Sequence, residues 1–327
     1  MVLTSEPDQS SGIAHPKEGF QKTSWLDQTI PVLEKLQPEQ TVELVIPQGM
    51  DYRFFIAELG RSARPYEFGG VCNPNTGSTI VIKGYAVGEK AAFSNATTSF
   101  VKSRSNPDGS TDDIFFHTHP WSEDEPLREL RQPDSSCRPS DSDINNTMAL
   151  RTIEEEAGFE RTVVLIIGSR GFISVTEASG VKFNESSLTQ AGLTDSQILE
   201  IKRYLALSPP VWLKNYAKDP ASEADLIRIV NEYYLRRTTD KSASFSTKKQ
   251  ELQEQIRPYV KNDSYRRDDL QRLVDSLTSH FPKYPGGGFL TNIGLSPEQS
   301  AMVKHMTGVT ITVFKVDGGI PPSQIYE

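Results

Sequence analysis

Two histidines and a nearby aspartate are the residues in this sequence whose types and spacing best suit metal chemistry. His117 and His119 belong to the segment FFHTHP, and Asp143 belongs to the segment PSDSD that follows it. On a β-strand, side chains two residues apart point to the same face and lie about 6.6–7 Å apart along the backbone. The His-x-His spacing therefore predicts two imidazoles on one side of a strand, where both can bind the same metal ion.

Asp143 is placed to supply a third ligand, because it lies one turn into a helix predicted from about Ser142 to Ala157. Two imidazoles and one carboxylate leave a coordination position for water, which is typical of a catalytic zinc site. The pattern Ser140-x-x-Asp143 is also a helix N-cap signature. The two interpretations are compatible, since a residue in the first turn of a helix can still present its side chain to a metal.

The elements predicted around these residues make up an α+β domain over residues 41–185. Alternating apolar residues and turn signals predict strands over residues 41–46, 52–57, 78–85, 114–119, 163–167 and 172–176. Residues 1–40 are predicted to form a flexible arm with a short helix near residues 26–36, in which Pro31 has to lie in the first turn.

The second half of the chain, residues 190–327, is predicted to be a mostly helical domain. Apolar residues at spacings of three and four predict helices over residues 194–207, 222–237, 247–259, 268–281 and 297–305. A final strand is predicted over residues 309–316. Pro209-Pro210, residues 240–246 and the segment PGGG at 285–288 are predicted to be linkers or joints.

Composition excludes several classes of protein. The chain has 327 residues, of which 36% are hydrophobic, so it can bury at least one large core. No apolar run is long enough for a membrane helix, and the N-terminus lacks a secretory pattern, so we expect a cytoplasmic protein, with signal-less export left open. The two cysteines, Cys72 and Cys137, are too few for a disulfide scaffold. They remain weak alternatives as metal ligands or as a redox pair.

Charge is unevenly distributed along the chain. Residues 121–143 carry seven acidic and three basic side chains, whereas residues 236–283 carry eleven basic and seven acidic ones. The basic segment mixes both signs at helical spacing, which is more typical of a solvated helix face than of a nucleic-acid interface. Four basic residues are expected to be exposed there and could meet an acidic partner or the acidic segment itself, namely Lys248, Lys249, Arg266 and Arg267. We therefore expect neither a nucleic acid nor a membrane as a partner.

A third motif extends the pattern. Glu67 stands in the segment YEFGGV, where a carboxylate leads into a pair of glycines. Taken in order, E-x-G-G, H-T-H-P and P-S-x-x-D resemble the motifs of the JAMM zinc metalloprotease family, also called MPN-plus or JAB. The resemblance covers about residues 50–180 and implies a cytidine-deaminase-like mixed β-sheet flanked by helices. Glu58 is a competing carboxylate, but it lacks the glycine pair.

The resemblance implies a role for each motif residue. His117, His119 and Asp143 are similar to the three ligands of the zinc ion, of which the family binds one per chain. Glu67 is similar to the general base that takes a proton from the zinc-activated water, and Ser140 is similar to the serine that hydrogen-bonds the tetrahedral intermediate. The reaction that the resemblance implies is hydrolysis of an amide bond in a protein or peptide substrate, with ubiquitin or a ubiquitin-like tail as the substrate class.

One departure from the family pattern leaves the substrate open. Twenty residues, 120–139, separate His119 from Ser140, which is more than in most members. The longer segment resembles that of some bacterial JAB-type domains in toxins and effectors. An exported effector that cuts an unrelated peptide and a non-catalytic MPN-like interaction scaffold are therefore the alternatives to an isopeptidase. The helical domain could serve as a substrate clamp, a partner-docking module or a targeting segment.

Overall fold

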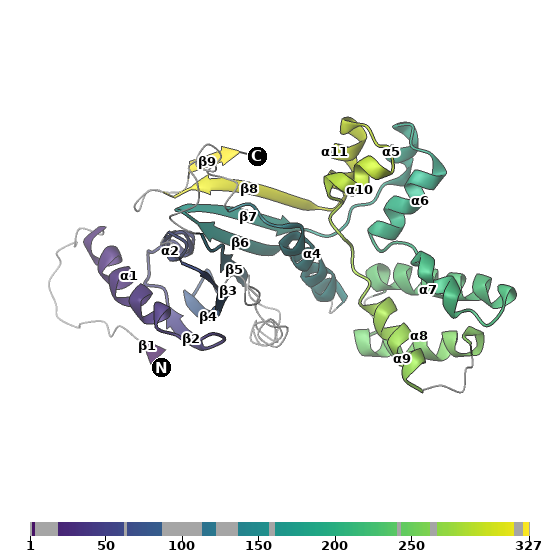
Figure 1. The fold of residues 1–327 in the computed structure, drawn as a ribbon, viewed down its shortest axis with the longest axis horizontal. Helices are drawn as coiled ribbons and strands as arrows, with labels where there is room; N and C mark the ends of the chain where they lie inside the picture. Colours follow the sequence, from purple (N-terminus) through teal and green to yellow (C-terminus); the bar gives the residue numbers. More distant parts are fainter. Residues whose placement is uncertain are drawn as a thin grey trace. The chain divides into compact units, whose positions relative to one another are not determined.

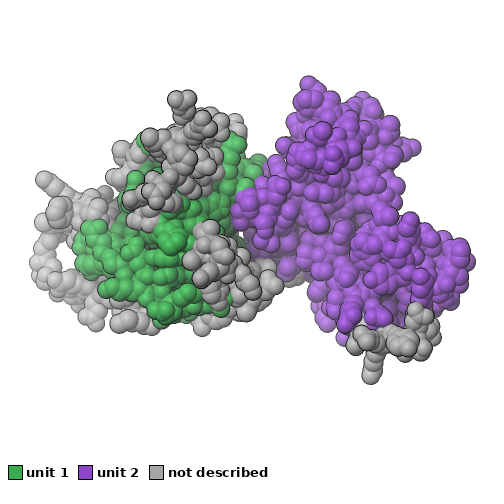
Figure 2. All heavy atoms as spheres, viewed as in Figure 1, with its two compact units in different colours: residues 1–139, 164–177, 310–327 green, residues 140–163, 178–309 purple. Residues whose placement is uncertain are grey.

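The structure, a computed structural model, describes residues 2–3, 19–61, 64–86, 113–121, 137–156, 161–240, 243–261, 267–316 and 323–326. The chain divides into two compact units, which Figure 2 shows in different colours. Unit 1 comprises residues 1–139, 164–177 and 310–327, and unit 2 comprises residues 140–163 and 178–309. Residues 4–18 of the predicted arm and residues 122–136 of the segment between the histidines and Ser140 lie outside the described residues.

Unit 1 is built on one mixed β-sheet with the strand order β1-β2-β4-β3-β5-β6-β7-β8-β9 (Figure 1). The pairs β2–β4, β4–β3, β3–β5 and β8–β9 are antiparallel, whereas β1–β2 and β5–β6 are parallel. The predicted α+β class is thus confirmed. Its elements are β1 (Val2–Leu3), α1 (Gly19–Glu34), β2 (Thr41–Val45), α2 (Tyr52–Leu59), β3 (Tyr66–Cys72), β4 (Ser78–Ala86), β5 (Ile114–Thr118), β6 (Val163–Ser169), β7 (Phe172–Ala178), β8 (Val309–Lys315) and β9 (Ser323–Tyr326).

The two faces of the sheet are distinguished by the alternation of side chains along β3 and β5. Phe68 and Phe116 point to one face, where they join the large core cluster that also contains residues of α1 and α2. Val71 and Phe115, at odd positions of the same strands, belong to a small separate cluster. Because successive side chains of a strand point to opposite faces, the odd positions of β3 and β5 lie on the face away from the α1 and α2 cluster.

The prediction of a strand over residues 52–57 was wrong, since these residues form the helix α2. Asp51 caps the helix, and its carboxylate accepts a hydrogen bond from the backbone N–H of Arg53 at 2.8 Å. Phe55, Ile56 and Leu59 are fully buried at helical spacing in the core of unit 1. Burial of this apolar face therefore outweighs the β-propensity of the aromatic residues on which the prediction depended.

The predicted helix near residues 26–36 is confirmed as α1, but Pro31 lies well inside it rather than in its first turn. A proline in a helix interior removes one backbone hydrogen bond and is costly. Leu26 and Leu33, on either side of Pro31, are buried in the core of unit 1. We attribute the persistence of the helix across Pro31 to this burial.

Unit 2 contains the helix that follows the acidic segment together with the helices of the second half. They are α4 (Asp141–Glu156), α5 (Glu185–Gln190), α6 (Asp195–Tyr204), α7 (Pro220–Thr239), α8 (Phe245–Ile256), α9 (Arg267–Thr278), α10 (Gly287–Asn292), α11 (Pro297–Met306) and the 3-10 turns Val211–Tyr216 and Arg257–Tyr259. Two apolar clusters stabilise the helices of the second half, one around α7, α8 and α9 and one around α5, α6, α10 and α11.

Two of the predicted joints are ordered parts of unit 2. Pro209 and Pro210 are buried, so this segment is packed rather than a flexible linker. The glycine segment is also not a simple joint, because Gly286 is the N-cap of α10 and Gly287 begins the helix. Burial of Leu290 in the cluster with α5, α6 and α11 accounts for helix formation by these otherwise unfavourable glycines.

The two compact units differ from the predicted ranges 41–185 and 190–327 at two places. Strand β8 belongs to the sheet, where it neighbours β7, because Val316 is buried in the core of unit 1 and donates its N–H to the carbonyl of Gly171 at 3.0 Å. Helix α4 groups with the other helices. Its Asn145 side chain accepts a hydrogen bond from the backbone N–H of Tyr284 at 2.6 Å, and its last residue, Glu156, forms a buried ion pair with Arg237 of α7.

The expected exposure of Lys248 was wrong. Its side chain is 2% exposed and donates a hydrogen bond to the backbone carbonyl of Asp240, so it closes the end of α7 instead of facing solvent. Lys249 forms an ion pair with Asp275 of α9 at 2.6 Å. Neither lysine therefore contributes a simple basic surface. Arg266 and the side chain of Arg267 lie outside the described residues.

His280, after the end of α9, is expected to make unit 2 sensitive to acid. Burial lowers the pKa of this imidazole from its usual 6.5, and the nearby charges of Arg237 and Lys283 act in the same direction, against the hydrogen bond with the carbonyl of Arg203. Because the folded state disfavours the charged form, the stability due to this group is present above about pH 6.5 and is lost as the pH falls through the lowered pKa. We expect His280→Gln to lose less thermal stability than the wild type between about pH 7 and pH 5. An unchanged pH dependence, relative to the exposed control His305→Gln, would contradict this expectation.

Candidate metal centre

Strand β5 positions His117 through the alternation of its side chains. Ile114, Phe116 and Thr118 are buried, and the first two belong to the core cluster of unit 1. Phe115 and His117 are half-buried and point to the other face. The strand that was predicted over residues 114–119 thus presents His117 on the face away from the α1 and α2 cluster.

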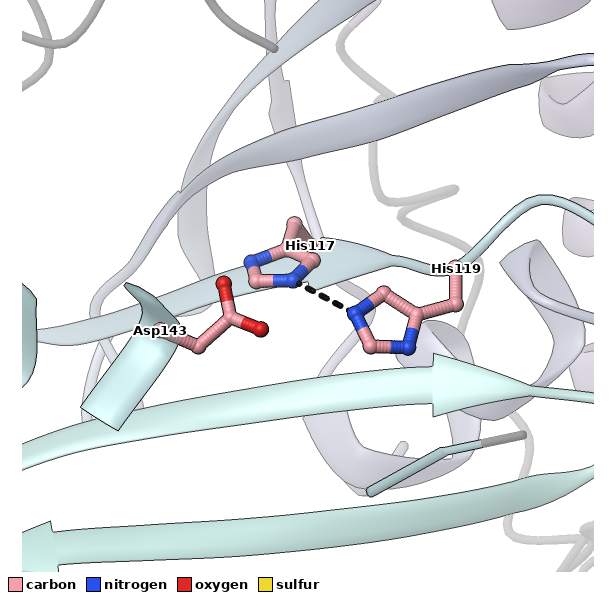
Figure 3. Close-up of side chains that lie close together, drawn as sticks. All are labelled: His117, His119 and Asp143. Atoms are coloured by element: carbon pink, nitrogen blue, oxygen red, sulfur yellow. Dashed lines mark hydrogen bonds between the residues drawn. The ribbon is translucent and has the colours of Figure 1, made fainter. Parts of the chain in front are cut away.

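His119 directly follows β5 and is held by the backbone of β6. Its N–H donates to the carbonyl of Gly168 at 3.0 Å, and its own carbonyl accepts a hydrogen bond from the hydroxyl of Ser169 at 3.4 Å. The Nε2 atoms of His117 and His119 lie 3.2 Å apart, and the two ring centroids are 5.1 Å apart. Figure 3 shows that the two rings present these nitrogens to one another. The predicted convergence of the two imidazoles is therefore confirmed.

Asp143 lies in the first turn of α4, where a reciprocal cap fixes it. The carboxylate Oδ2 accepts hydrogen bonds from the backbone N–H of Ser140 at 2.8 Å and from its hydroxyl at 2.7 Å, while the N–H of Asp143 donates to the Ser140 hydroxyl at 3.2 Å. The N-cap interpretation is thus confirmed. The carboxylate also points toward the two histidine rings (Figure 3), and one ligand atom from each of His117, His119 and Asp143 lies within 4.8 Å of the others.

The geometry of these three residues fits a divalent metal ion. Two nitrogens bound to tetrahedral zinc at 2.0–2.1 Å lie about 3.3 Å apart, which is close to the 3.2 Å between the two Nε2 atoms. Without a metal, one imidazole would have to donate a hydrogen bond to the other. The group could therefore hold a metal ion, and it is the only group of this kind in the part of the chain that the structure describes.

Glu67 lies on β3 at a β-bulge, where the register with β4 shifts between Tyr66 and Phe68. Tyr66 and Phe68 both pack into the core cluster of unit 1, so Glu67 between them points to the face that carries His117. Its side chain is half-buried. Two residue steps along β3 here span three steps along β4, from Ala86 to Lys83, so the extra residue of the bulge lies on β4. Glu67 is not one of the three residues of the candidate metal group.

The glycine pair after Glu67 has a steric basis. Gly69 pairs with His117 across the antiparallel ladder, so any side chain at position 69 would stand beside the imidazole. Gly70 has no room for a side chain, because a Cβ atom there would lie 1.8 Å from the carbonyl oxygen of Ile80. The E-x-G-G motif thus lets β3 pack tightly between β4 and β5 at the level of the histidines.

Thr118 is a supporting residue for which the sequence analysis gave no role. Its side chain is 1% exposed, and its hydroxyl accepts a hydrogen bond from the N–H of Phe68 at 2.9 Å. This bond satisfies a backbone donor at the bulge beside Glu67. The sequence signal for this role is a small polar residue between the two histidines. Strand alternation places its side chain on the buried face, opposite the histidine side chains, where it needs a hydrogen-bond partner.

The competing candidates are accounted for by other contacts. Burial raises the pKa of the Cys72 thiol to about 11, so it is neutral near pH 7 and a poor metal ligand. Cys137 is buried, and its carbonyl accepts a hydrogen bond from the hydroxyl of Ser174 at 2.6 Å. Glu58 lies on α2, where it forms an ion pair with Arg61 at 2.7 Å.

Comparisons with protein-family models, with curated proteins and with solved structures each gave no match. Among the residues that the structure describes, no helix combines the length and the apolar character needed to span a membrane. The resemblance to the JAMM family therefore depends on the motifs alone.

Proposed function

We propose that this protein is a zinc-dependent metallopeptidase or isopeptidase of the JAMM type, with one zinc ion per chain. The observation that carries the proposal is the convergence of ligand atoms from His117, His119 and Asp143. Two imidazoles and one carboxylate are a donor set used by catalytic zinc sites, which keep a coordination position open. The carboxylate of Glu67, on the same face of the sheet as His117, supplies the remaining acid–base group.

The chemistry follows from the residues that surround the site. When bound, a zinc ion polarises a carbonyl group and makes a water molecule acidic near neutral pH. His117 and His119 would hold it through their Nε2 lone pairs, and Asp143 through its carboxylate. Glu67 takes a proton from the attacking water and passes it to the nitrogen of the departing amine. Ser140 donates its hydroxyl to the substrate oxygen, which requires that hydroxyl to turn away from Asp143.

The substrate that we propose is an amide bond in a protein or peptide, with ubiquitin-like proteins as the first class to screen. A second candidate is a metal-free MPN-like scaffold that binds other proteins without catalysis. One observation favours it, because the reciprocal cap with Ser140 gives Asp143 a structural role that needs no metal. Metal content separates the two candidates.

Measurement of bound metal by mass spectrometry tests the proposal. We expect one zinc per chain in the wild type after zinc supplementation and none in the His117→Ala/His119→Ala variant, because a single carboxylate retains zinc poorly. The control is His305→Ala, since His305 is exposed on α11 and lies outside the group. A folded wild-type protein that binds no zinc would contradict the peptidase proposal and leave the scaffold.

A further inference from the structure

Trp121, which follows His119 by two residues, is anchored to the backbone carbonyl of Gly60 at the end of α2. This oxygen accepts a hydrogen bond from the indole N–H of Trp121 at 3.2 Å and another from the backbone N–H of Arg170 at 2.8 Å. Trp121 is also fixed through its backbone, because its own carbonyl accepts a hydrogen bond from the N–H of Arg64 at 3.1 Å. Trp121 is thus held through both its side chain and its main chain, two residues after a predicted metal ligand.

Arg170 contributes a stacking contact from an unfavourable backbone conformation. It lies in the turn between β6 and β7 with a φ of 53°, a left-handed value that residues other than glycine rarely adopt. From this position its guanidinium carbon lies 4.8 Å from the centroid of the Trp121 ring. Such conformations persist where the surrounding structure fixes them, and they occur often near functional sites.

Close backbone packing connects this arrangement to His119 itself. A Cβ atom at Gly60 would lie 2.5 Å from the backbone of Gly168, so the end of α2 and the end of β6 are in direct contact. The carbonyl of the same Gly168 accepts the hydrogen bond from the N–H of His119. The backbone of His119 is therefore bonded to β6, and the chain two residues later is anchored through Trp121.

We infer that Trp121 and Arg170 are positioning residues that fix His119 for metal binding, Trp121 through its indole hydrogen bond to Gly60 and Arg170 through its guanidinium stack on the Trp121 ring. This inference rests on the proposed metal site. Both residues act by limiting the motion of the chain just after His119. Partners that orient a metal ligand typically change metal affinity about 10–100-fold when they are removed.

Titration with Co²⁺, followed by its visible absorption, tests this inference without any substrate. We expect Trp121→Phe, which keeps an aromatic ring but loses the indole N–H, and Arg170→Gly to bind Co²⁺ about tenfold more weakly and to shift its absorption bands. Arg170→Gly is the more informative variant, because glycine accepts the left-handed conformation and should not destabilise the metal-free fold. A loss of Co²⁺ affinity in Arg170→Gly would therefore come from the missing stack on Trp121 and not from unfolding. The matched control is Trp212→Phe, whose ring lies in unit 2 beside Tyr216.

Different results would contradict the positioning role of Trp121 and Arg170 and the proposed peptidase function. Co²⁺ affinity and absorption bands equal to those of the wild type in both Trp121→Phe and Arg170→Gly would overturn the inference. A wild type that binds no Co²⁺ or Zn²⁺ would overturn both the metal site and the inference. A wild type that binds metal but cleaves no peptide, with the variants weakened as expected, would contradict the peptidase proposal and support the positioning role.

Discussion

Replacement of Glu67 by glutamine is expected to lower the rate of amide hydrolysis about 10²–10⁴-fold, while the protein still binds one zinc ion. Glutamine has nearly the same shape as glutamate but cannot take a proton from water at neutral pH. Glu67 lies outside the group formed by His117, His119 and Asp143, so its replacement leaves all three ligands in place. The expected signature is therefore a loss of kcat without a loss of metal.

The measurement combines kcat on a cleaved peptide or ubiquitin-like substrate with zinc content for the same preparation. Glu58→Gln is the matched control, because Glu58 is the competing carboxylate and lies on α2 in an ion pair with Arg61. We expect this control to keep its activity. Full activity in Glu67→Gln would show that another group is the base, and loss of zinc from Glu67→Gln would show that Glu67 supports the metal directly.

The candidate site was largely predictable from the sequence because its determinants are local. The two-residue period of a strand places His117 and His119 together, and the Ser140-x-x-Asp143 cap places Asp143 in the first turn of a helix. The position of Glu67 was harder to predict, since it depends on the register shift between β3 and β4 and on which strands are partners in the sheet. No local pattern specifies which strands pair.

The errors in the fold prediction have a common physical cause, which is tertiary packing. Residues 52–57 contain aromatic residues typical of strands, yet burial against the core of unit 1 makes them a helix. The strand over residues 309–315 was predicted correctly, but its place beside β7 depends on backbone partners more than 130 residues away. Hydrophobic periodicity reports only on neighbouring residues and does not indicate pairing between strands so far apart in the sequence. The boundaries of the compact units could therefore not be predicted.

The second large effect is expected from the buried ion pair between Arg237 of α7 and Glu156 of α4. Both side chains are less than 5% exposed, and the Arg237 guanidinium also donates to the carbonyl of His280 at 2.8 Å. Removal of one partner leaves the other charge buried and uncompensated. We therefore expect Arg237→Ala to lower the free energy of unfolding by about 3–5 kcal/mol at neutral pH.

The pH dependence of this loss identifies its cause. Burial raises the pKa of Glu156 even with Arg237 present, and Arg237 acts against this shift. Without Arg237 the pKa of Glu156 in the folded protein rises further. The stability due to this carboxyl group is therefore present below its usual pKa of about 4.5 and is lost as the pH rises through the raised pKa of the folded state. The deficit of Arg237→Ala should therefore be larger at about pH 7.5 than at about pH 5.

Urea unfolding of the full chain, followed by circular dichroism at both pH values, measures these differences. Arg228→Ala is the matched control on the same helix, because Arg228 pairs with Asp225 and Glu232 on the exposed face, where ion pairs contribute little. The double replacement Glu156→Gln/Arg237→Met removes both charges and should recover most of the lost stability. A deficit in Arg237→Ala that is the same at both pH values, and that the double replacement does not reduce, would mean that the packing of Arg237 against Tyr233, Tyr234 and Phe281 stabilises unit 2 more than its charge.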